Sequence, residues 1–357
     1  MGNEILSLQE FNLSREIIKQ NVLPHYNLQN AKISIIKFKD TDKQRAVYRI
    51  DSNEKSYCLK KVYYNINDLL YVYSAIEWLY RNNIRVPKLL PTVDNNRFVS
   101  YQDMLFILTP WINGEKCNFD NINHVMLSVR KLSYIHSISR NFQPILGSSL
   151  KEGFDDYYIS TLKHFQDLLQ TSNEAFKYKD TFSRQFILTF DTNLHLAKIS
   201  LDISNKIDNS NLSKSLCHGD YVNKNLIFPS DLDPWIIDFD KCKKDYSARD
   251  LAFFMRRLLK RENTKWNIDL ALSVLETYNK SSPLTDSDLR YLISYICFPQ
   301  KYWKISRDYY KNIHKCNKSS FLTLLLNSNS KADLQYDFAL SIIDGVQKRF
   351  NITLLQN

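Results

Sequence analysis

Alternation of apolar and polar residues predicts a β-rich region near the beginning of the chain. It follows a short helical lead-in over residues 1–30. Runs rich in Ile, Val and Tyr, bounded by polar clusters, are typical of strands. Three such runs are followed, further along, by two that read as a hairpin. The predicted strands are Lys32–Phe38, Arg45–Ile50, Ser56–Tyr63, Arg97–Tyr101 and Met104–Thr109.

Apolar residues three or four positions apart predict helices over most of the remaining chain. Leu216–Phe239 interrupts this pattern with loop and short strands. The outline is an α+β, bilobal chain, with a small β-rich N-terminal lobe at residues 1–110 and a large helical C-terminal lobe at residues 111–357. Helical stretches are predicted at Asn65–Asn82, His124–Ile138, Asp155–Lys206 and from Arg249 onward.

Composition is that of a folded chain and narrows the function classes. The 357 residues are 44% hydrophobic and 24% charged, with a formal charge of +10. No apolar run approaches the ~18 residues of a membrane span, and the N-terminus lacks a signal-peptide pattern, so we expect no membrane partner. The six cysteines form no C-x-x-C pair and are expected to be reduced thiols. Basic residues cluster without a nucleic-acid module signature, which favours a solvated surface over nucleic-acid binding.

Glycine is scarce, and this excludes one kind of nucleotide site. The chain has only 6 glycines, and none lies between Gly2 and Gly114. Neither G-x-G-x-x-G nor G-x-x-x-x-G-K-[ST] can therefore occur. The turn Asp40–Arg45 contains two aspartates and no glycine, and the aspartates would repel any phosphates bound there. This turn is the feature that least fits a nucleotide site.

The loop-rich interruption holds the residues with the clearest chemistry. His218-Gly219-Asp220 is followed by Asn225, and a short apolar strand then ends in Asp238. This order is similar to the catalytic and metal loops of protein-kinase-like phosphotransferases, in their small-molecule branch. The resemblance implies that Asp220 faces an acceptor hydroxyl. It also implies that Asn225 and Asp238 supply hard oxygen ligands to Mg²⁺ on ATP.

The third predicted strand resembles the one that supplies a phosphate-binding lysine in that fold. Lys60 and Lys61 compete for this role. Strand alternation puts Lys60 on the face that also carries Cys58, a residue small enough to line an adenine pocket, so we choose Lys60. Val47, on the preceding strand, would cover the adenine from the same side.

Two further elements complete the predicted nucleotide site. Glu77 lies seventeen residues after Lys60 and is the acid of the Asn65–Asn82 helix beyond its first turn. It is predicted to hold the lysine, the alternative being an ordinary exposed helix acid. Thr109 and Trp111 are predicted to lie in a hinge that offers backbone groups to adenine.

Three segments narrow the resemblance to the CotS family of bacterial spore coat proteins, built on the aminoglycoside phosphotransferase fold. They are Pro87–Thr92, Pro110–Glu115, and Phe298–Trp303 with Tyr309-Tyr310. The resemblance spans about residues 30 to 350. It implies a protein that is made in the cytoplasm of the mother cell of an endospore former and is then deposited in the spore coat.

Together these features favour an ATP- and Mg²⁺-dependent phosphotransferase that acts on a hydroxyl group. The acceptor is left open among a small molecule, a polysaccharide and a protein, and other spore coat proteins are possible partners. The alternative is a non-catalytic structural coat component that keeps the kinase-like fold. A basic nucleic-acid binder is a weaker third hypothesis, and it would show strongly salt-dependent affinity.

Overall fold

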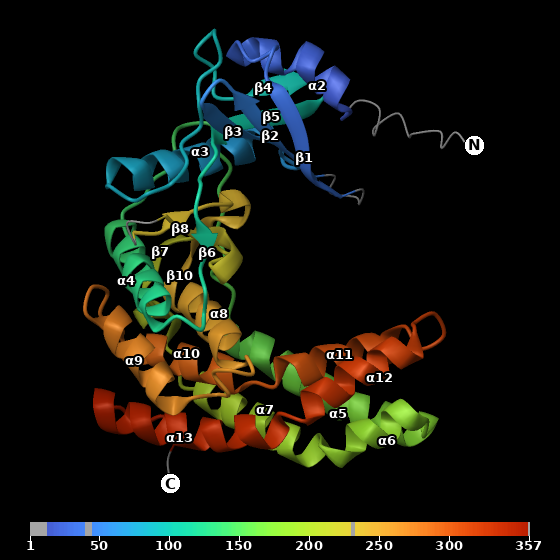
Figure 1. The fold of residues 1–357 in the computed structure, drawn as a ribbon. Helices are drawn as coiled ribbons and strands as arrows, with labels where there is room; N and C mark the ends of the chain where they lie inside the picture. Colours follow the sequence, from blue (N-terminus) through green and yellow to red (C-terminus); the bar gives the residue numbers. More distant parts are fainter. Residues whose placement is uncertain (1–12, 40–44, 230–232, 356–357) are drawn as a thin grey trace. The chain divides into compact units, whose positions relative to one another are not determined.

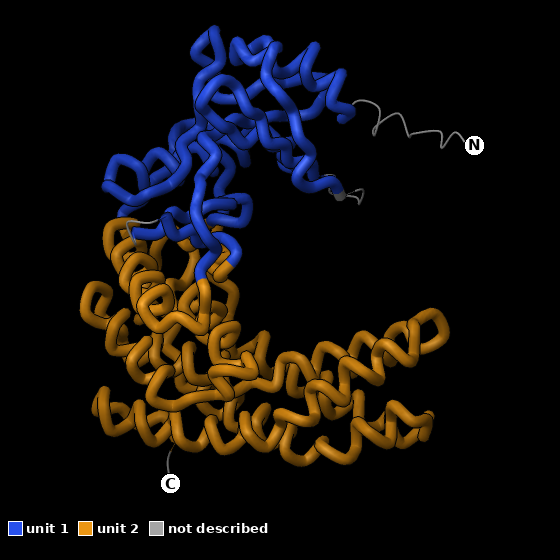
Figure 2. Tube along the Cα trace, viewed as in Figure 1, with its two compact units in different colours: residues 1–117, 141–151, 224–242 blue, residues 118–140, 152–223, 243–357 orange. Residues whose placement is uncertain are grey.

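The chain divides into two compact units that interleave along the sequence (Figure 2). A computed structural model describes residues 13–39, 45–229 and 233–355. The two units do not coincide with the lobes predicted at residues 1–110 and 111–357. The predicted lobe boundary therefore stays a prediction. Unit 1 comprises residues 1–117, 141–151 and 224–242, and unit 2 comprises residues 118–140, 152–223 and 243–357.

Unit 1 is built on an antiparallel five-stranded sheet with the order β1-β2-β3-β5-β4 (Figure 1). All five predicted strands are present, with ends that differ by a few residues. The predicted turn at residues 40–44 lies outside the described residues. The strands are β1 (Lys32–Lys39), β2 (Arg45–Ser52), β3 (Lys55–Lys61), β4 (Val99–Tyr101) and β5 (Met104–Pro110).

One face of this sheet is covered by the short helices that precede it. α2 (Arg15–Asn21) and η1 (Leu23–Tyr26) share a core with alternate residues of the three central strands. The hydroxyl of Tyr48 donates a 2.6 Å hydrogen bond to the carbonyl of Leu13, which ties the lead-in to the sheet. Since successive side chains of a strand point to opposite faces, the residues between these core residues lie on the other face of the sheet. The covered face carries Ala46, Tyr48, Ile50, Leu59, Phe106 and Leu108.

Unit 1 also contains α3 (Ile66–Arg81) and a small second sheet. Asn65 caps α3, as its side chain accepts a hydrogen bond from the N–H of Asp68. The second sheet joins β6 (Glu115–Lys116), β8 (Leu226–Phe228) and β9 (Trp235–Ile236), and η4 (Phe239–Lys241) follows it. Gly114, before β6, has φ +149°, and a Cβ there would lie 2.5 Å from the carbonyl oxygen of Phe228. Only glycine permits this approach.

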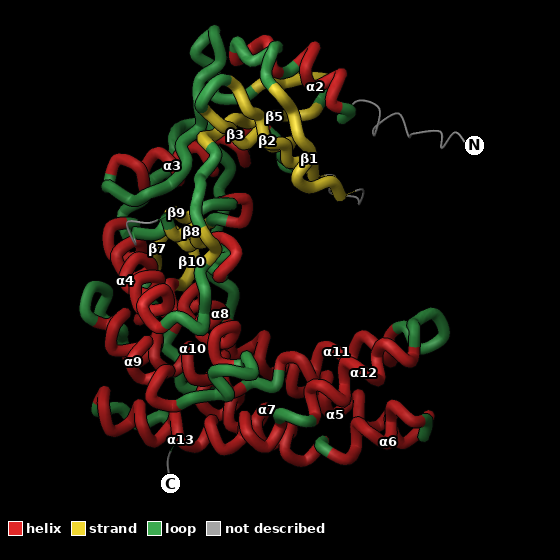
Figure 3. Tube along the Cα trace, in the orientation of Figure 1, coloured by secondary structure: helices red, strands yellow, loops and turns green. Residues whose placement is uncertain are grey.

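Unit 2 is mainly helical and carries one two-stranded ribbon, β7 with β10 (Figure 3). The 3₁₀ turn η2 (Asn209–Asn211) precedes β7, and η3 (Asn223–Asn225) lies where the chain passes from unit 2 to unit 1. Its elements are α4 (Ile122–Ile138), α5 (Tyr157–Tyr178), α6 (Thr181–Leu188), α7 (Phe190–Ser204), β7 (Lys214–Cys217), β10 (Lys243–Tyr246), α8 (Ser247–Leu259), α9 (Ile268–Asn279), α10 (Asp286–Cys297), α11 (Gln300–Lys311), α12 (Lys318–Asn329) and α13 (Ala332–Phe350).

The helical stretch predicted over Asp155–Lys206 is three helices. Lys179 ends α5 in the left-handed conformation with φ 54°, and Asp180 caps α6 by accepting the N–H of Ser183 at 2.9 Å. Periodicity alone does not reveal this break, because apolar residues continue at helical spacing on both sides.

The predicted α+β class is confirmed: a β-rich N-terminal region precedes a helical C-terminal region. Among the described residues, no helix is both long and apolar enough to cross a bilayer.

Candidate nucleotide and catalytic site

Four of the predicted nucleotide-binding residues lie on one face of the unit 1 sheet. Val47 of β2 lies directly opposite Lys60 of β3, and Cys58 lies opposite Thr109 of β5. Residues directly opposite each other in an antiparallel pair point to the same face, as do residues two apart on one strand. These four side chains are therefore on the face opposite to Leu59 and the buried core.

The thiol of Cys58 is held in its neutral form. Burial is the main cause that raises its pKa to about 11, while the nearby Lys60 ammonium and the Thr109 hydroxyl act in the other direction. A neutral, compact thiol offers an apolar surface, which suits a site beside a flat aromatic ring.

Trp111 continues the sheet just beyond β5. Its backbone N–H donates a 3.0 Å hydrogen bond to the carbonyl of Ser56, and the guanidinium of Arg49 lies 5.1 Å from its ring centroid. That N–H is thus engaged within the sheet. The predicted hinge, in which Thr109 and Trp111 offer backbone groups to adenine, remains a prediction for their backbone groups other than this N–H.

Lys60 lies between two carboxylates of the segment that follows β9. Its Nζ is 2.6 Å from Oδ1 of Asp238 and 2.7 Å from Oδ1 of Asp240. Burial alone would lower the pKa of the Lys60 ammonium, but the charges of Asp240 and Asp238 outweigh it and raise the pKa above its ordinary value. Lys60 is therefore a fixed, permanently charged group.

Glu77 does not hold Lys60 in this structure. Its carboxylate lies 3.9 Å from Nε of Arg81, one turn further along α3. In the part of the chain that the structure describes, the carboxylate partners of Lys60 are Asp238 and Asp240. The helix places an arginine within i,i+4 reach of Glu77, whereas the segment after β9 brings its two acids directly to the lysine.

The backbone of Asp238 adopts an uncommon conformation. Its φ of 70° and ψ of 62° lie in the left-handed region. Such a conformation costs free energy for a residue other than glycine and persists only where the surroundings impose it. The N–H of Ile237 donates a 3.0 Å hydrogen bond to the carbonyl of Asn225, and Leu226 pairs with Ile236. This pairing places the predicted metal ligands Asn225 and Asp238 at neighbouring strand ends.

The oxygen donors of this segment fit a hard divalent cation. Asp240 is 7% exposed, and its Oδ2 is buried with no hydrogen-bond partner among the described residues. An orphaned carboxylate oxygen in a buried place is costly unless a cation or water meets it. Carboxylates of Asp238 and Asp240 with the amide of Asn225 form the donor set that Mg²⁺ prefers. Asp238 and Asn225 would hold the metal, with Asp240 beside them.

The sequence places Asp240 near the predicted metal ligand Asp238 without distinguishing a ligand from a supporting acid, and it does not single out Tyr64. The Tyr64 hydroxyl lies 3.4 Å from Oδ1 of Asp240. Burial, and then the charge of Asp240, raises the pKa of Tyr64, which keeps its proton available for donation. The sequence signal for Asp240 is its position as the second acid in Asp238-Phe239-Asp240. Two acids at this spacing are too common to assign a role without a structure.

Asp220 belongs to unit 2, where a buried carboxylate braces its loop. Asp250 accepts the backbone N–H of His218 at 2.6 Å and that of Gly219 at 3.0 Å. The N–H of Asp220 donates to Nδ1 of His218 at 3.2 Å. Gly219 has φ 73°, which favours glycine at this position. The carboxyl group of Asp220 is thus carried on a rigid turn, and the residue is 7% exposed.

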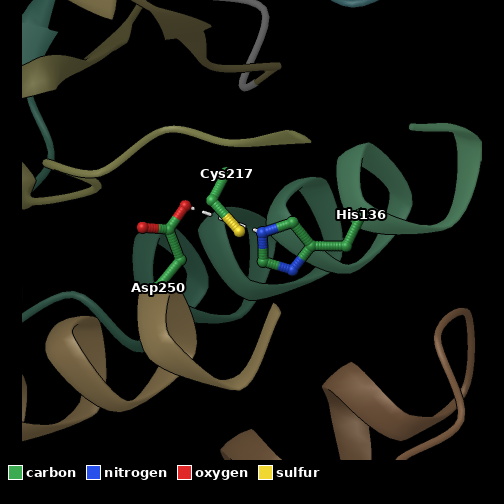
Figure 4. A group of neighbouring side chains, drawn as sticks. All are labelled: His136, Cys217 and Asp250. Carbon is green, nitrogen blue, oxygen red and sulfur yellow. Dashed lines mark ion pairs between the residues drawn. The ribbon is translucent and has the colours of Figure 1, made fainter. Parts of the chain in front are cut away.

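Asp250 belongs to a buried cluster with His136 and Cys217 (Figure 4). Nε2 of His136 lies 3.6 Å from the Asp250 carboxylate, and its Nδ1 lies 2.6 Å from the hydroxyl of Tyr278. Burial would raise the pKa of Asp250, but His136 and the bonds from His218 lower it overall.

Cys217 completes this cluster, and its thiol lies 3.6 Å from the carbonyl oxygens of Asp245 and Tyr246. Burial, followed by the charges of Asp250 and Asp245, raises the pKa of its thiol well above the ordinary value. The bonds that Asp250 accepts from the His218 and Gly219 N–H groups make the cluster a brace for the loop that carries Asp220.

Comparison with solved structures defines the class of fold. An aminoglycoside phosphotransferase from Alicyclobacillus acidocaldarius aligns with a TM-score of 0.74 at 20% identity, over 97% of this chain and 98% of the other. A spectinomycin phosphotransferase in complex with ADP and spectinomycin gives 0.61 at 18% identity, over 94% and 99%. An amicoumacin kinase in complex with AMP-PNP, Ca²⁺ and its antibiotic gives 0.57 at 13%, over 93% and 96%. The protein has the kinase-like phosphotransferase fold predicted from its sequence.

The family follows from a match over most of the chain. Residues 32–339 match the family described as "Spore coat putative kinase YutH", and the chain belongs to this family. The predicted CotS-like resemblance is confirmed.

Proposed function

We propose that the protein transfers the γ-phosphoryl group of ATP to a hydroxyl group, with Mg²⁺ as cofactor. The observation that carries this proposal is the Lys60 ammonium, which bridges Asp238 and Asp240 at 2.6 and 2.7 Å beside a strained backbone at Asp238. Strain of this kind concentrates at functional sites. The fold, shared with enzymes whose solved structures contain ADP or AMP-PNP, supports the same conclusion.

The proposed nucleotide site lies on the face of the unit 1 sheet opposite to the core that α2 and η1 cover. Val47 and Cys58 would contact the adenine, with Thr109 and Trp111 at its edge. Lys60 would leave its carboxylate partners to neutralise the α- and β-phosphates. In this state Glu77 would take over the pairing with Lys60. The lobes at residues 1–110 and 111–357 would be the nucleotide-binding and the catalytic lobe.

Asp238 and Asn225 would hold Mg²⁺, which neutralises charge that develops on the phosphate oxygens. Asp220 would orient the acceptor hydroxyl and accept its proton as the oxygen attacks the γ-phosphorus. The bond from that phosphorus to the bridging oxygen of the β-phosphate breaks, and ADP leaves with the electron pair. The brace by Asp250 would keep Asp220 in position through this step.

The acceptor would be a small molecule, a polysaccharide or a protein hydroxyl. The family description supports deposition in the spore coat. Synthesis in the mother cell and contacts with other coat proteins would accompany that location.

Release of ADP tests the catalytic proposal even while the acceptor is unknown. In the absence of an acceptor hydroxyl, water can slowly accept the γ-phosphoryl group, and ADP is still released. We expect Mg²⁺-dependent ADP release by the wild type. We expect it to be about 10²–10⁴-fold slower in Asp220→Asn, the range that general-base catalysis supplies. ATP affinity should be retained in that variant. ATP binding without ADP release, with any of a panel of alcohols, sugars or coat proteins, would instead favour the non-catalytic coat component.

A further inference from the structure

A cavity in unit 2 is lined by none of the residues assigned to the nucleotide site. Its volume is about 210 Å³, and its lining residues come from the end of α8, the beginning of α11, the end of α12 and the beginning of α13. Among the residues that the structure describes, no carboxylate lines it, and aromatic, amide and hydroxyl side chains complete the wall. Five cationic residues line it: Arg256, Lys260, Arg261, Lys301 and Lys331.

Most of this positive charge has no negative partner. Arg261 pairs with Asp120 at 2.7 Å, and Lys331 contacts Glu262. Lys260 and Lys301 make no ion pair within the described residues. The net charge at the cavity is thus about +3. Like charges held together destabilise a fold by repulsion unless a ligand compensates them.

Arg256 is fixed by neutral groups, which leaves its charge uncompensated. Its guanidinium donates to the Tyr295 hydroxyl at 2.9 Å and to Oε1 of Gln300 at 3.3 Å, and it lies over the Tyr295 ring at 4.2 Å. A guanidinium held in one orientation loses little conformational entropy when an oxyanion binds.

The cations lie close enough to perturb one another. Burial of its stem is the largest cause that lowers the pKa of Lys260 to about 8, although the residue stays more than a third exposed. Repulsion from neighbouring cations adds to this shift, and the contributing residues are Lys301, Arg257, Arg256 and Lys331.

The walls of the cavity are rigid. The side-chain amide of Gln335 donates to the carbonyls of Ile296, Cys297 and Phe298 at 3.2 to 3.5 Å, which fixes the corner between α10 and α11. Trp266 lines the cavity in the left-handed conformation with φ 55°. A bulky residue keeps this strained backbone conformation only where its surroundings hold it, so the position of Trp266 in the wall is fixed.

The first turn of α11 adds to the same positive field. It contains no acid, and its cap makes no side-chain hydrogen bond. Gln300 and Lys301, at the first two positions of this helix, both line the cavity. The exposed N–H groups and dipole of a helix beginning favour an anion beside the lysines.

We propose that this cavity binds a small phosphate-bearing anion. One or two phosphate groups carry two or three negative charges and offer oxygen acceptors to lysine and arginine donors, which matches the uncompensated charge. A volume of about 210 Å³ accommodates a group of that size and is below the usual range for a whole nucleotide. The phosphate is either free or the end of a phosphorylated metabolite. This site stands independently of the proposed phosphotransferase activity.

Inorganic pyrophosphate is the probe for a calorimetric titration of the full chain, without divalent metal and at about 0.15 M ionic strength. The test variant is Lys260→Gln/Lys301→Gln. The control Lys280→Gln/Lys311→Gln removes the same charge from exposed lysines of unit 2 outside the cavity. Lys60→Gln reports any binding at the nucleotide site. Glycerol 3-phosphate and inorganic phosphate distinguish a phosphorylated metabolite from the free anion.

We expect saturable binding by the wild type, the control and Lys60→Gln. In the test variant it should weaken by about tenfold or more, the loss of one or two charge-assisted contacts. Three results would overturn the proposal: no saturable binding, equal weakening in the control, or binding lost only in Lys60→Gln. Duplex DNA that displaces pyrophosphate and binds far more tightly would assign the cavity to nucleic acid instead.

Discussion

At the scale of single residues, the centre of the proposed site is a lysine balanced by two acids. The carboxylate of Asp240 is nearly buried, so its charge depends on Lys60 or on a metal cation. This dependence links stability to the same groups that would bind nucleotide.

Lys60→Met should destabilise the protein and make its stability sensitive to Mg²⁺. The substitution leaves the Asp240 carboxylate buried without a counter-charge, at a cost of about 3 kcal/mol in the free energy of unfolding. Added Mg²⁺ should restore more stability to the variant than to the wild type. Urea unfolding with and without Mg²⁺ measures both effects. Lys61→Met is the neighbouring control, and an equal Mg²⁺ response in both variants would contradict the metal assignment.

Glu77→Gln separates the roles of this acid in the free and the nucleotide-bound protein. Glu77 contacts Arg81 on the surface of α3, so the free energy of unfolding should change by no more than about 0.5 kcal/mol. If Glu77 holds Lys60 when ATP is bound, Mg²⁺-dependent ADP release should fall by about tenfold. Unchanged turnover would leave Glu77 as an ordinary helix acid.

At the scale of elements, the sequence predicts the strands well because each has one covered face. The register of β2, β3 and β5 then follows from alternation, and it is what brings Val47, Lys60 and Cys58 to one side. Lys60 rather than Lys61 reaches the two acids, as alternation suggested.

Other features depend on contacts distant in sequence, which local patterns do not encode. The pairing of Lys60 with Asp240 spans 180 residues, and no spacing rule anticipates it. The break of the long helical stretch at Lys179 depends on one left-handed residue and one cap. The brace by Asp250 also has no local sequence signal, because its partners are backbone groups of a loop about 31 residues away.

The loop that carries Asp220 should depend on Asp250 for stability, and this dependence should vary with pH. Asp250→Asn weakens the bonds to two buried N–H groups, which should cost about 2 kcal/mol at neutral pH. The pKa of Asp250 is lowered in the folded protein, so its contribution is present above the unfolded value of 3.8. It is lost as pH falls through the lower folded value.

Urea unfolding of wild type and Asp250→Asn, followed from neutral pH to below pH 4, measures that change. The difference in the free energy of unfolding should shrink only at the acidic end. A difference that does not vary with pH would show that the Asp250 charge does not stabilise the loop.

At the scale of the whole molecule, part of the positive charge gathers in unit 2, whereas the proposed nucleotide-binding residues lie in unit 1. The net charge of +10 invites a nucleic-acid interpretation, yet part of it is concentrated at the unit 2 cavity, whose size suits a small anion. Glycine scarcity excludes glycine-rich phosphate loops, yet Gly114 occupies a position that only glycine permits, and Gly219 one whose backbone conformation favours glycine.

Unit 1 is proposed to bind ATP through Mg²⁺ held at Asp238. Calorimetric titration with ATP, with and without Mg²⁺, tests it most directly. Asp238→Asn is the informative variant, because asparagine tolerates the left-handed backbone while the charge is removed. Asp94→Asn, on an exposed turn of the same unit, is the matched control. We predict saturable, Mg²⁺-dependent binding by the wild type and the control, weakened by about tenfold or more in Asp238→Asn. Absence of binding by the wild type, or equal binding by Asp238→Asn, would contradict the account.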